Sequence, residues 1–307
     1  MTAAVVVGAG LEEMATAVGA VGPVAAVGGR TAWDLGGAPR GDDVRLVAAP
    51  VGLVEHVPAE MTVRVGAGTT VADLHAALSE AGQTTVLPER SGSTVGGALA
   101  VGRDGVGRLG RGRLRDALLE ARYVSAEGRV VKAGGPTVKN VSGYDLCRLL
   151  VGSLGTLGLL GEVVLRTRPV PPCSRWFAGE GADLAAVRGV LYRPAAVLWD
   201  GSMTSVWLEG HEADVEAEAT VLAGLGLAAV DGPPAVPPHR RACAVEDLAS
   251  LAGPFLAELG TGVAHVDEPA PAPVPPEPVV ALARRIREAL DPTGRLNPGR
   301  DPLAVVR

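Results

Sequence analysis

The sequence predicts a mixed α+β protein of 307 residues, with a second unit after a proline-rich stretch. Short alternating segments such as Met61–Val65 and Glu162–Thr167 have the period of strands. Val71–Ala81 has the apolar spacing of a helix, and Thr69-Thr70 can cap it. The composition then changes after Pro169–Pro172, where shorter strand-like and helix-like segments follow. These observations favour two units that each mix helices with strands.

The first fifty residues read as two apolar strands separated by a helix and followed by a glycine-rich loop. Ala3–Val7 and Val24–Val27 are the apolar runs, and Gly28–Gly37 is the loop. Two glycines follow the first run as in a dinucleotide-binding fingerprint, but Glu13 stands where the third glycine is needed, so we expect no Rossmann domain. Consecutive glycines in Gly28–Gly37 can present N–H groups to a phosphate, or they can form a long hairpin connection.

A second glycine-rich stretch, Gly134–Gly161, is the most unusual part of the chain. Polar residues from Lys139 to Asp145 lead into an apolar run, and glycine then recurs at every third position from Gly152. Each glycine costs about 0.5–1 kcal/mol in a regular element, so the pattern indicates backbone that lies close against a flat or charged group. A glycine-rich turn between a helix and a strand is the simpler alternative.

Arginines crowd between Arg103 and Arg115, with Asp116 beside them. They indicate either a solvated basic loop or a site for an anion, because guanidinium suits phosphate and carboxylate. Beyond Pro172 we expect a small α+β unit in which proline-rich residues 231–238 and 269–278 are linkers. The further expected elements are a β-hairpin of Leu118–Val124 with Arg129–Lys132, strands at Trp176-Phe177, Val197–Trp199 and Val206–Glu209, and helices at Asp183–Val190, Ala213–Leu225, Val245–Leu259 and Val279–Leu290.

Charge and composition exclude several classes of protein. The net charge is −6 and aromatic residues make up 3% of the chain, which argues against a nucleic-acid-binding surface. No run of about 18 apolar residues appears, and the apolar start lacks the charged segment of a signal peptide, so we expect a cytoplasmic protein without a transmembrane segment. The three cysteines are widely separated and predict neither a disulfide framework nor a metal centre.

Several motifs follow one another in a fixed order along the chain. They are Gly28-Gly29-Arg30-Thr31, a stretch from Leu53 to Gly68, Gly92–Gly97, Lys139–Asp145 leading into Gly152–Gly158, and Asp291–Gly299. Together they resemble the flavoproteins with a PCMH-type FAD-binding domain, the vanillyl-alcohol oxidase superfamily, and above all the FAD-binding subunits of glycolate oxidases. Arg30 departs from the family pattern because it replaces the third glycine of the loop, which changes the turn if that position needs a positive φ.

The resemblance implies a fold of three parts. Residues 1-172 would form a PCMH-type FAD-binding domain with subdomains of about 1-50 and 51-172. Residues 173-278 would form a short α+β cap or substrate region with proline-rich linkers, and residues 279-307 a C-terminal helix and tail that return to the FAD domain.

The resemblance also implies a cofactor, FAD, with the glycine loop on its diphosphate and the other glycine segments along its ring. Histidine is absent from the loop and from the surroundings of Arg108–Asp116, so FAD should be bound non-covalently. The residues that the resemblance assigns to FAD binding are Gly28, Gly29, Arg30, Thr31, Ala32, Trp33, Leu35, Pro88, Gly92, Ser93, Thr94, Gly96, Gly97, Arg115, Asp116, Lys139, Asn140, Val141, Gly143, Tyr144, Gly158 and Val163.

By the same resemblance the chain is a subunit of an FAD-dependent oxidoreductase. It would oxidise a small 2-hydroxy acid such as glycolate by hydride transfer to flavin N5. Electrons would leave to larger FAD-binding and iron–sulfur subunits, which could hold the chain at a membrane. The alternatives are a stand-alone FAD-dependent alcohol or sugar oxidase or dehydrogenase, and a non-catalytic relay subunit. The histidines of the cap, His211, His239 and His265, are isolated, so the sequence names no catalytic base. Arg240 and Arg241 either hold a substrate carboxylate or belong to a solvated basic turn.

Overall fold

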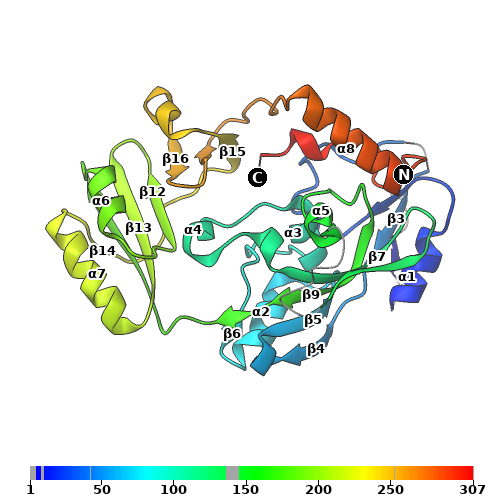
Figure 1. Cartoon of the computed structure of the whole chain (residues 1–307), viewed down its shortest axis with the longest axis horizontal. Helices are drawn as coiled ribbons and strands as arrows, with labels where there is room; N and C mark the ends of the chain where they lie inside the picture. The colour runs from blue at the N-terminus through cyan, green and yellow to red at the C-terminus, as the bar shows by residue number, and fades with distance from the viewer. Residues whose placement is uncertain (1–4, 8–9, 42, 136–144, 252, 307) are drawn as a thin grey trace. The chain divides into compact units, whose positions relative to one another are not determined.

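The computed structural model describes residues 5–7, 10–41, 43–135, 145–251 and 253–306. The chain divides into two compact units. The first unit comprises Met1–Arg103, Arg113–Pro169 and Pro273–Val305, and the second comprises Asp104–Gly112, Val170–Ala272 and Val306–Arg307. The predicted α+β class is confirmed, since each unit combines a β-sheet with helices (Figure 1). None of the described helices is both long and apolar enough to cross a bilayer.

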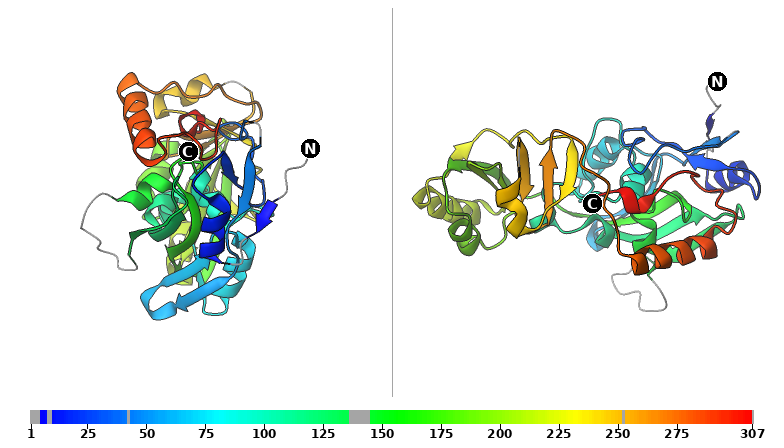
Figure 2. Two further views of the ribbon diagram at one scale, coloured as in Figure 1. Left: turned by 90° about the vertical axis from the view of Figure 1, so that its right-hand side faces the viewer. Right: turned by 90° about the horizontal axis from the view of Figure 1, so that it is seen from above.

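A small parallel sheet opens the first unit. Its strands are β1 (Val5–Val7), β2 (Val24–Ala26) and β3 (Arg45–Ala48), in the order β1-β3-β2. Helix α1 (Leu11–Val18) lies against this sheet, as the blue segments of Figure 2 show. Acidic side chains in the first turn of α1 suit its positive end, and Gly19 ends the helix at φ 54°.

A five-stranded antiparallel sheet forms the larger part of the first unit, in the order β4-β5-β9-β7-β8. Helices α2, α3 and α5 contribute to one apolar core with this sheet. The side chain of Thr70 caps α2 by accepting the amide of Asp73 at 3.0 Å, as the sequence predicts. The elements are β4 (Leu53–Val57), β5 (Thr62–Gly66), α2 (Val71–Ser79), β6 (Gln83–Thr84), α3 (Val95–Val101), β7 (Leu118–Val124), β8 (Val130–Gly134), α5 (Leu146–Leu150), β9 (Leu159–Arg166) and β10 (Arg168–Pro169).

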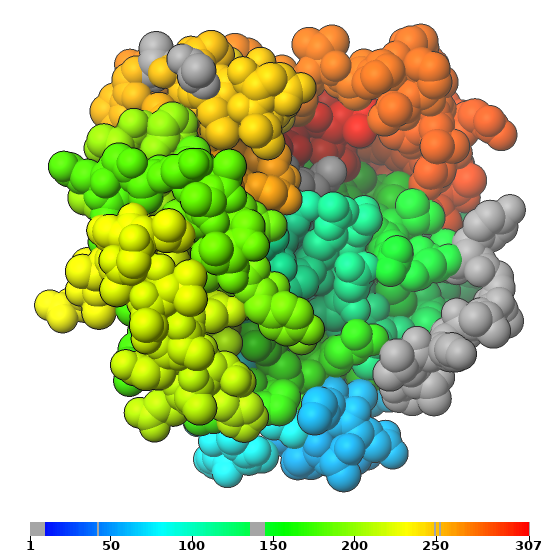
Figure 3. Space-filling view, turned by 60° about the vertical axis from the view of Figure 1, so that its left-hand side comes forward, coloured from blue at the N-terminus to red at the C-terminus, as the bar shows by residue number. Residues whose placement is uncertain are grey.

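A C-terminal segment returns to the first unit. Helix α8 (Glu277–Leu290) has no fully buried side chain, and Figure 3 shows it as orange atoms on the surface. The segment after it pairs with β2, because Val24 donates its amide to the carbonyl of Arg295 and accepts the amide of Asn297. Leu296 is fully buried in the core beneath the parallel sheet. The C-terminal segment therefore extends the parallel sheet beside β2.

The second unit is a seven-stranded antiparallel sheet in the order β14-β11-β13-β12-β16-β17-β15. Helices α6 and α7 pack on it through Val187, Val215 and Leu222. The short helix α4 also belongs to this unit, and the amide of Gly110 bonds the carbonyl of Ala195. The elements are α4 (Arg108–Arg111), β11 (Cys173–Glu180), α6 (Leu184–Val190), β12 (Ala196–Trp199), β13 (Met203–Gly210), α7 (Glu212–Gly224), β14 (Ala228–Val230), β15 (His239–Ala242), β16 (Phe255–Glu258) and β17 (Val263–Val266).

Two interpretations of the second unit are wrong. The predicted helix Val245–Leu259 is instead a 3-10 turn, Val245–Ser250, followed by strand β16. Gly253 at φ 73° precedes a proline there, and this pair breaks a helix. The solvated basic turn predicted at Arg240 is also wrong. Arg240 lies on strand β15, and its guanidinium is 3.6 Å from the buried carboxylate of Glu258.

Candidate cofactor site

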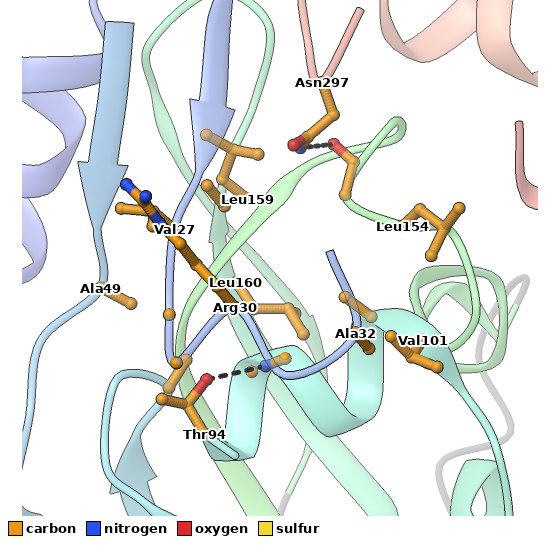
Figure 4. Close-up of a pocket in the computed structure, with 18 of the residues that line it drawn as sticks. Val27, Arg30, Ala32, Ala49, Thr94, Val101, Leu154, Leu159, Leu160 and Asn297 are labelled. Atoms are coloured by element: carbon orange, nitrogen blue, oxygen red, sulfur yellow. Dashed lines mark hydrogen bonds between the residues drawn. The ribbon is translucent and has the colours of Figure 1, made fainter. Parts of the chain in front are cut away.

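A cavity lies within the first unit between the loop after β2, the start of α3, and the segment that leads into β9 (Figure 4). Its empty volume is about 810 Å³, open solvent at its mouth included. Its wall consists of glycine backbone, small aliphatic side chains and a few polar groups. The lining residues are Ala26–Trp33, Ala49, Ala67, Gly68, Thr94, Gly96, Gly97, Ala100, Val101, Ser153–Gly155, Gly158–Leu160, Asn297 and Arg300.

The glycine loop after β2 touches the loop before α3 so closely that side chains cannot fit. A Cβ on Gly28 would lie 2.4 Å from Oγ1 of Thr94, and one on Gly29 would lie 1.6 Å from the carbonyl oxygen of Gly92. Arg30 follows at φ 55°, in the left-handed region that a glycine would occupy without strain. Arg30 adopts this conformation at a cost of about 1–2 kcal/mol.

The first turn of α3 presents bare backbone to the cavity. The side chain of Thr94 accepts the amide of Gly97 at 3.2 Å, which is one of the dashed bonds in Figure 4. A Cβ on Gly96 would lie 2.9 Å from Ala67, so this glycine is needed for packing. A Cβ on Gly97 would meet only Oγ1 of its own cap, at 3.0 Å, so this glycine leaves space on the cavity side.

The glycines that recur after Gly152 serve contacts inside the protein as well. A Cβ on Gly155 would lie 2.5 Å from Nδ2 of Asn297, and one on Gly158 would lie 2.4 Å from the ring of Tyr123. Gly161 lies within strand β9 and faces a side chain of α1. Much of the unusual pattern therefore reflects close packing of this segment against its own chain, and not contact with a bound group alone.

Two cavity residues from the C-terminal segment were missed by sequence reasoning. Asn297 is 2% exposed and donates from Nδ2 to the carbonyl of Gly155 at 3.0 Å. Arg300 is 9% exposed and donates from Nη2 to the carbonyl of Trp33 at 2.8 Å. Burial lowers the pKa of Arg300, and the carboxylate of Asp34 acts in the opposite sense. The motif around Asn297 was visible in the sequence, but its distance along the chain from the glycine loop hid the shared cavity.

The structure brings together only some of the residues that the sequence assigns to FAD. Those that line the cavity are Gly28, Gly29, Arg30, Thr31, Ala32, Trp33, Thr94, Gly96, Gly97 and Gly158. Those placed outside its lining are Leu35, Pro88, Gly92, Ser93, Arg115, Asp116 and Val163. Lys139, Asn140, Val141, Gly143 and Tyr144 lie outside the described residues.

The residues placed outside the lining differ in their surroundings. Gly92 and Ser93 form the loop that touches Gly29. Asp116 accepts an ion pair from Arg148 at 2.8 Å, and Val163 is 1% exposed in the core of the large sheet.

Residues 2–134 match the family model described as FAD binding domain. This part of the chain is therefore similar to an FAD-binding domain. The match covers the glycine loop and the start of α3, which form two walls of the cavity. The remaining walls come from the segment before β9 and from the C-terminal tail.

Curated relatives agree with this assignment. Glycolate oxidase subunit GlcE of Escherichia coli is 34% identical over 189 residues, which are 56% of this chain and 52% of that protein. D-lactate dehydrogenase of Archaeoglobus fulgidus is 36% identical over 48% of this chain and 33% of its own. Glycolate oxidase subunit GlcD of Bacillus subtilis is 38% identical over 31% of this chain and 20% of its own. The chain thus matches about half of the first of these proteins and less of the other two.

Solved structures share the fold. Alkyldihydroxyacetonephosphate synthase superposes with a TM-score of 0.72 over 96% of this chain and 75% of its own, at 15% identity. A Bermuda grass isoallergen, BG60, superposes with a TM-score of 0.54 over 71% of this chain and 48% of its own, at 16% identity. At such identities the likeness establishes the fold alone.

The chemistry of the wall fits FAD. Aliphatic side chains including Val101, Leu159 and Leu160 suit a flavin ring, and the bare backbone at Gly97 leaves room for one. Buried polar atoms with no hydrogen-bond partner among the described residues adjoin the same region, namely Oγ of Ser93 and Nε of Arg300. Such atoms are costly in an empty cavity and are expected beside a polar cofactor.

Proposed function

We propose that this chain is a flavoprotein subunit that takes part in the oxidation of a small 2-hydroxy acid such as glycolate. The observation that carries the proposal is the glycine-walled cavity of the first unit. The relatives, two glycolate oxidase subunits and a D-lactate dehydrogenase, support the substrate class. When bound, FAD supplies the acceptor for the two electrons that the substrate loses.

The chain's own residues would bind FAD without a covalent bond. The backbone of Gly28 and Gly29 would face the diphosphate, and Thr94 would hold the first turn of α3 beside the ring through its bond to Gly97. Val101 and Leu160 would exclude water from one side of the flavin. Because two of the relatives are named as subunits of glycolate oxidase, we also propose larger FAD-binding and iron–sulfur subunits as partners that receive the electrons.

A relay subunit that binds FAD without oxidising substrate is the second candidate. The imidazole of His265, which could otherwise serve as a base, is 4% exposed and lies 2.6 Å from the carboxylate of Glu258. The buried guanidinium of Arg240 adjoins the same carboxylate. A histidine and an arginine that are committed to an internal cluster favour a structural role for this part of the second unit.

Anaerobic titration of the purified chain separates the two candidates. The visible spectrum is recorded after reconstitution with FAD, and glycolate, D-lactate or L-lactate is then added. Bleaching of the flavin by one of these acids supports a substrate-oxidising subunit. A spectrum that changes only after partner subunits are added supports the relay subunit. A chain that binds no FAD refutes both, and acid precipitation that leaves yellow pellets refutes non-covalent binding.

A further inference from the structure

Arg300 places a buried positive charge in the wall of the FAD cavity. It is 9% exposed and comes from the C-terminal segment of the first unit. Its Cζ lies 5.0 Å from the centroid of the Trp33 ring, and Nη2 donates to the carbonyl of Trp33 at 2.8 Å. The ring and the carbonyl together fix the guanidinium in position, since a cation over an indole face is attracted to it.

Most donors of this guanidinium have no partner in the described part of the chain. A guanidinium carries five N–H groups, and that of Arg300 makes one hydrogen bond to these residues. No carboxylate forms an ion pair with it there, although the charge of Asp34 acts on it from farther away. Burying an unpaired cation is unfavourable, so an anion that binds beside Arg300 would relieve this cost.

A second guanidinium lies on the same indole. Cζ of Arg30 is 5.3 Å from the centroid of the Trp33 ring, and Arg30 belongs to the glycine loop. It lines the cavity and is among the residues labelled in Figure 4. Trp33 thus gathers two cations from segments far apart in the sequence, beside backbone that can also donate to an anion.

We propose that Arg300 and Arg30, both held on Trp33, bind the diphosphate of FAD and make this chain select the dinucleotide over riboflavin. The diphosphate is the anionic part of FAD, and guanidinium matches its paired oxygens by donating two parallel hydrogen bonds. The inference rests on the FAD-binding role of the first unit and is independent of the substrate. It adds the C-terminal tail to the determinants of cofactor choice.

The test is a set of binding titrations on the full chain. Arg300→Gln (R300Q), R300K, R30Q and the control R285Q, which changes an exposed arginine of α8, are titrated with FAD, ADP and riboflavin at low and high salt. R300Q should weaken FAD and ADP about ten- to hundredfold, the loss of one to two charge-assisted bonds, and change riboflavin affinity less than about twofold. R300K should be intermediate, and R285Q should equal the parent chain.

Other results would overturn the proposal. Equal losses for FAD and riboflavin in R300Q would mean that Arg300 shapes the cavity and does not contact phosphate. FAD affinity within about twofold of the parent would mean that it contacts nothing in the cofactor. If circular dichroism shows that R300Q does not fold, R30Q decides. R30Q removes a charge, so it should bind FAD with a weaker salt dependence than the parent chain, and an unchanged salt dependence would exclude the phosphate role. Substrate turnover is not measured, so failure here is distinct from failure of the proposed oxidation.

Discussion

Replacing Arg295 should destabilise the first unit by releasing the C-terminal segment. Arg295 is 6% exposed, and its guanidinium donates five hydrogen bonds to backbone carbonyls. Burial lowers its pKa, the like charge of Arg45 adds to this, and Asp291 opposes it. The five bonds go to the carbonyls of Val18, Gly19, Val21, Gly22 and Ala126, at 2.7–3.0 Å.

The size of the stability loss depends on which backbone carbonyls are left without a side-chain donor. In Arg295→Met, Arg45 still donates to the carbonyls of Val18 and Val21, at 2.8 and 2.7 Å. Three carbonyls remain, and that of Ala126 is in the most buried of these bonds. At about 1–3 kcal/mol for each unsatisfied buried acceptor, and less where water can enter, we expect a loss of about 2–4 kcal/mol. This is a large part of the stability of one domain.

Equilibrium urea unfolding, followed by circular dichroism with and without FAD, measures this loss. The transition that FAD moves to higher urea belongs to the first unit, because a ligand stabilises the part that binds it. Only that transition should shift in the Met variant, and R295K should lose about half as much. The matched control, R285M on the exposed face of α8, should change stability by less than about 0.5 kcal/mol. A loss below about 1 kcal/mol in R295M would refute this account of how the tail is held.

Three further substitutions test other parts of the first unit. Gly29→Ala places a Cβ 1.6 Å from the carbonyl oxygen of Gly92, so it should lower the affinity for FAD more than tenfold in fluorescence titrations. Gly10→Ala is the control, because a Cβ at that position meets no atom within 4 Å and should leave the affinity unchanged. Burial alone would raise the pKa of Glu120, but hydrogen bonds from Arg64 and Lys132 lower this pKa below the ordinary value of 4.5. The ionised carboxylate therefore stabilises the fold above pH 4.5, and this stabilisation is lost as the pH falls through the lowered pKa of the folded state. Glu120→Gln should therefore lower the free energy of unfolding by about 3–5 kcal/mol at pH 7. The urea midpoint of the variant should also fall less steeply at acid pH than that of the parent chain, and an equally steep fall would contradict this. Burial raises the pKa of Cys147 to about 11, so a thiol reagent should label it in the folded chain at least tenfold more slowly than in urea, and equal rates would disprove its burial.

Local patterns predicted much of the first unit. The cap at Thr70 predicted the start of α2 because a hydroxyl before an apolar helical face satisfies a free amide. Glu127-Gly128 predicted a two-residue turn between β7 and β8. The hairpin is present, but the two-residue turn is wrong, because Val124 pairs with Val130 and the amide of Gly128 bonds the carbonyl of Ser125. Gly128 follows that turn at φ 74°, a conformation that glycine adopts readily. The glycine loop was predicted to present its backbone to a phosphate. It lines the cavity, and its glycines are also required by contacts within the protein, since a Cβ on Gly28 or Gly29 would meet Thr94 or Gly92.

Contacts between distant parts of the chain could not be read from local patterns. Arg240 looked like part of a basic turn because its partner, Glu258, lies on another strand, and only the sheet brings them to 3.6 Å. Gly253 interrupts the predicted helix Val245–Leu259, and the apolar spacing on either side of it concealed the break. Arg300 was passed over because nothing near it in sequence shows that its segment returns to the glycine loop.

We expect the C-terminal segment and the cofactor to be thermodynamically coupled. Asn297 and Arg300 line the cavity, and the segment that carries them is held by Arg295 and by pairing with Val24. If the docked tail raises the affinity for FAD, bound FAD must by linkage stabilise the docked tail to the same extent. Weakening the Arg295 anchor should therefore reduce FAD affinity although Arg295 does not line the cavity, and excess FAD should recover part of the lost stability. A cofactor site that Asn297 and Arg300 help to close can form only after these residues have been synthesised.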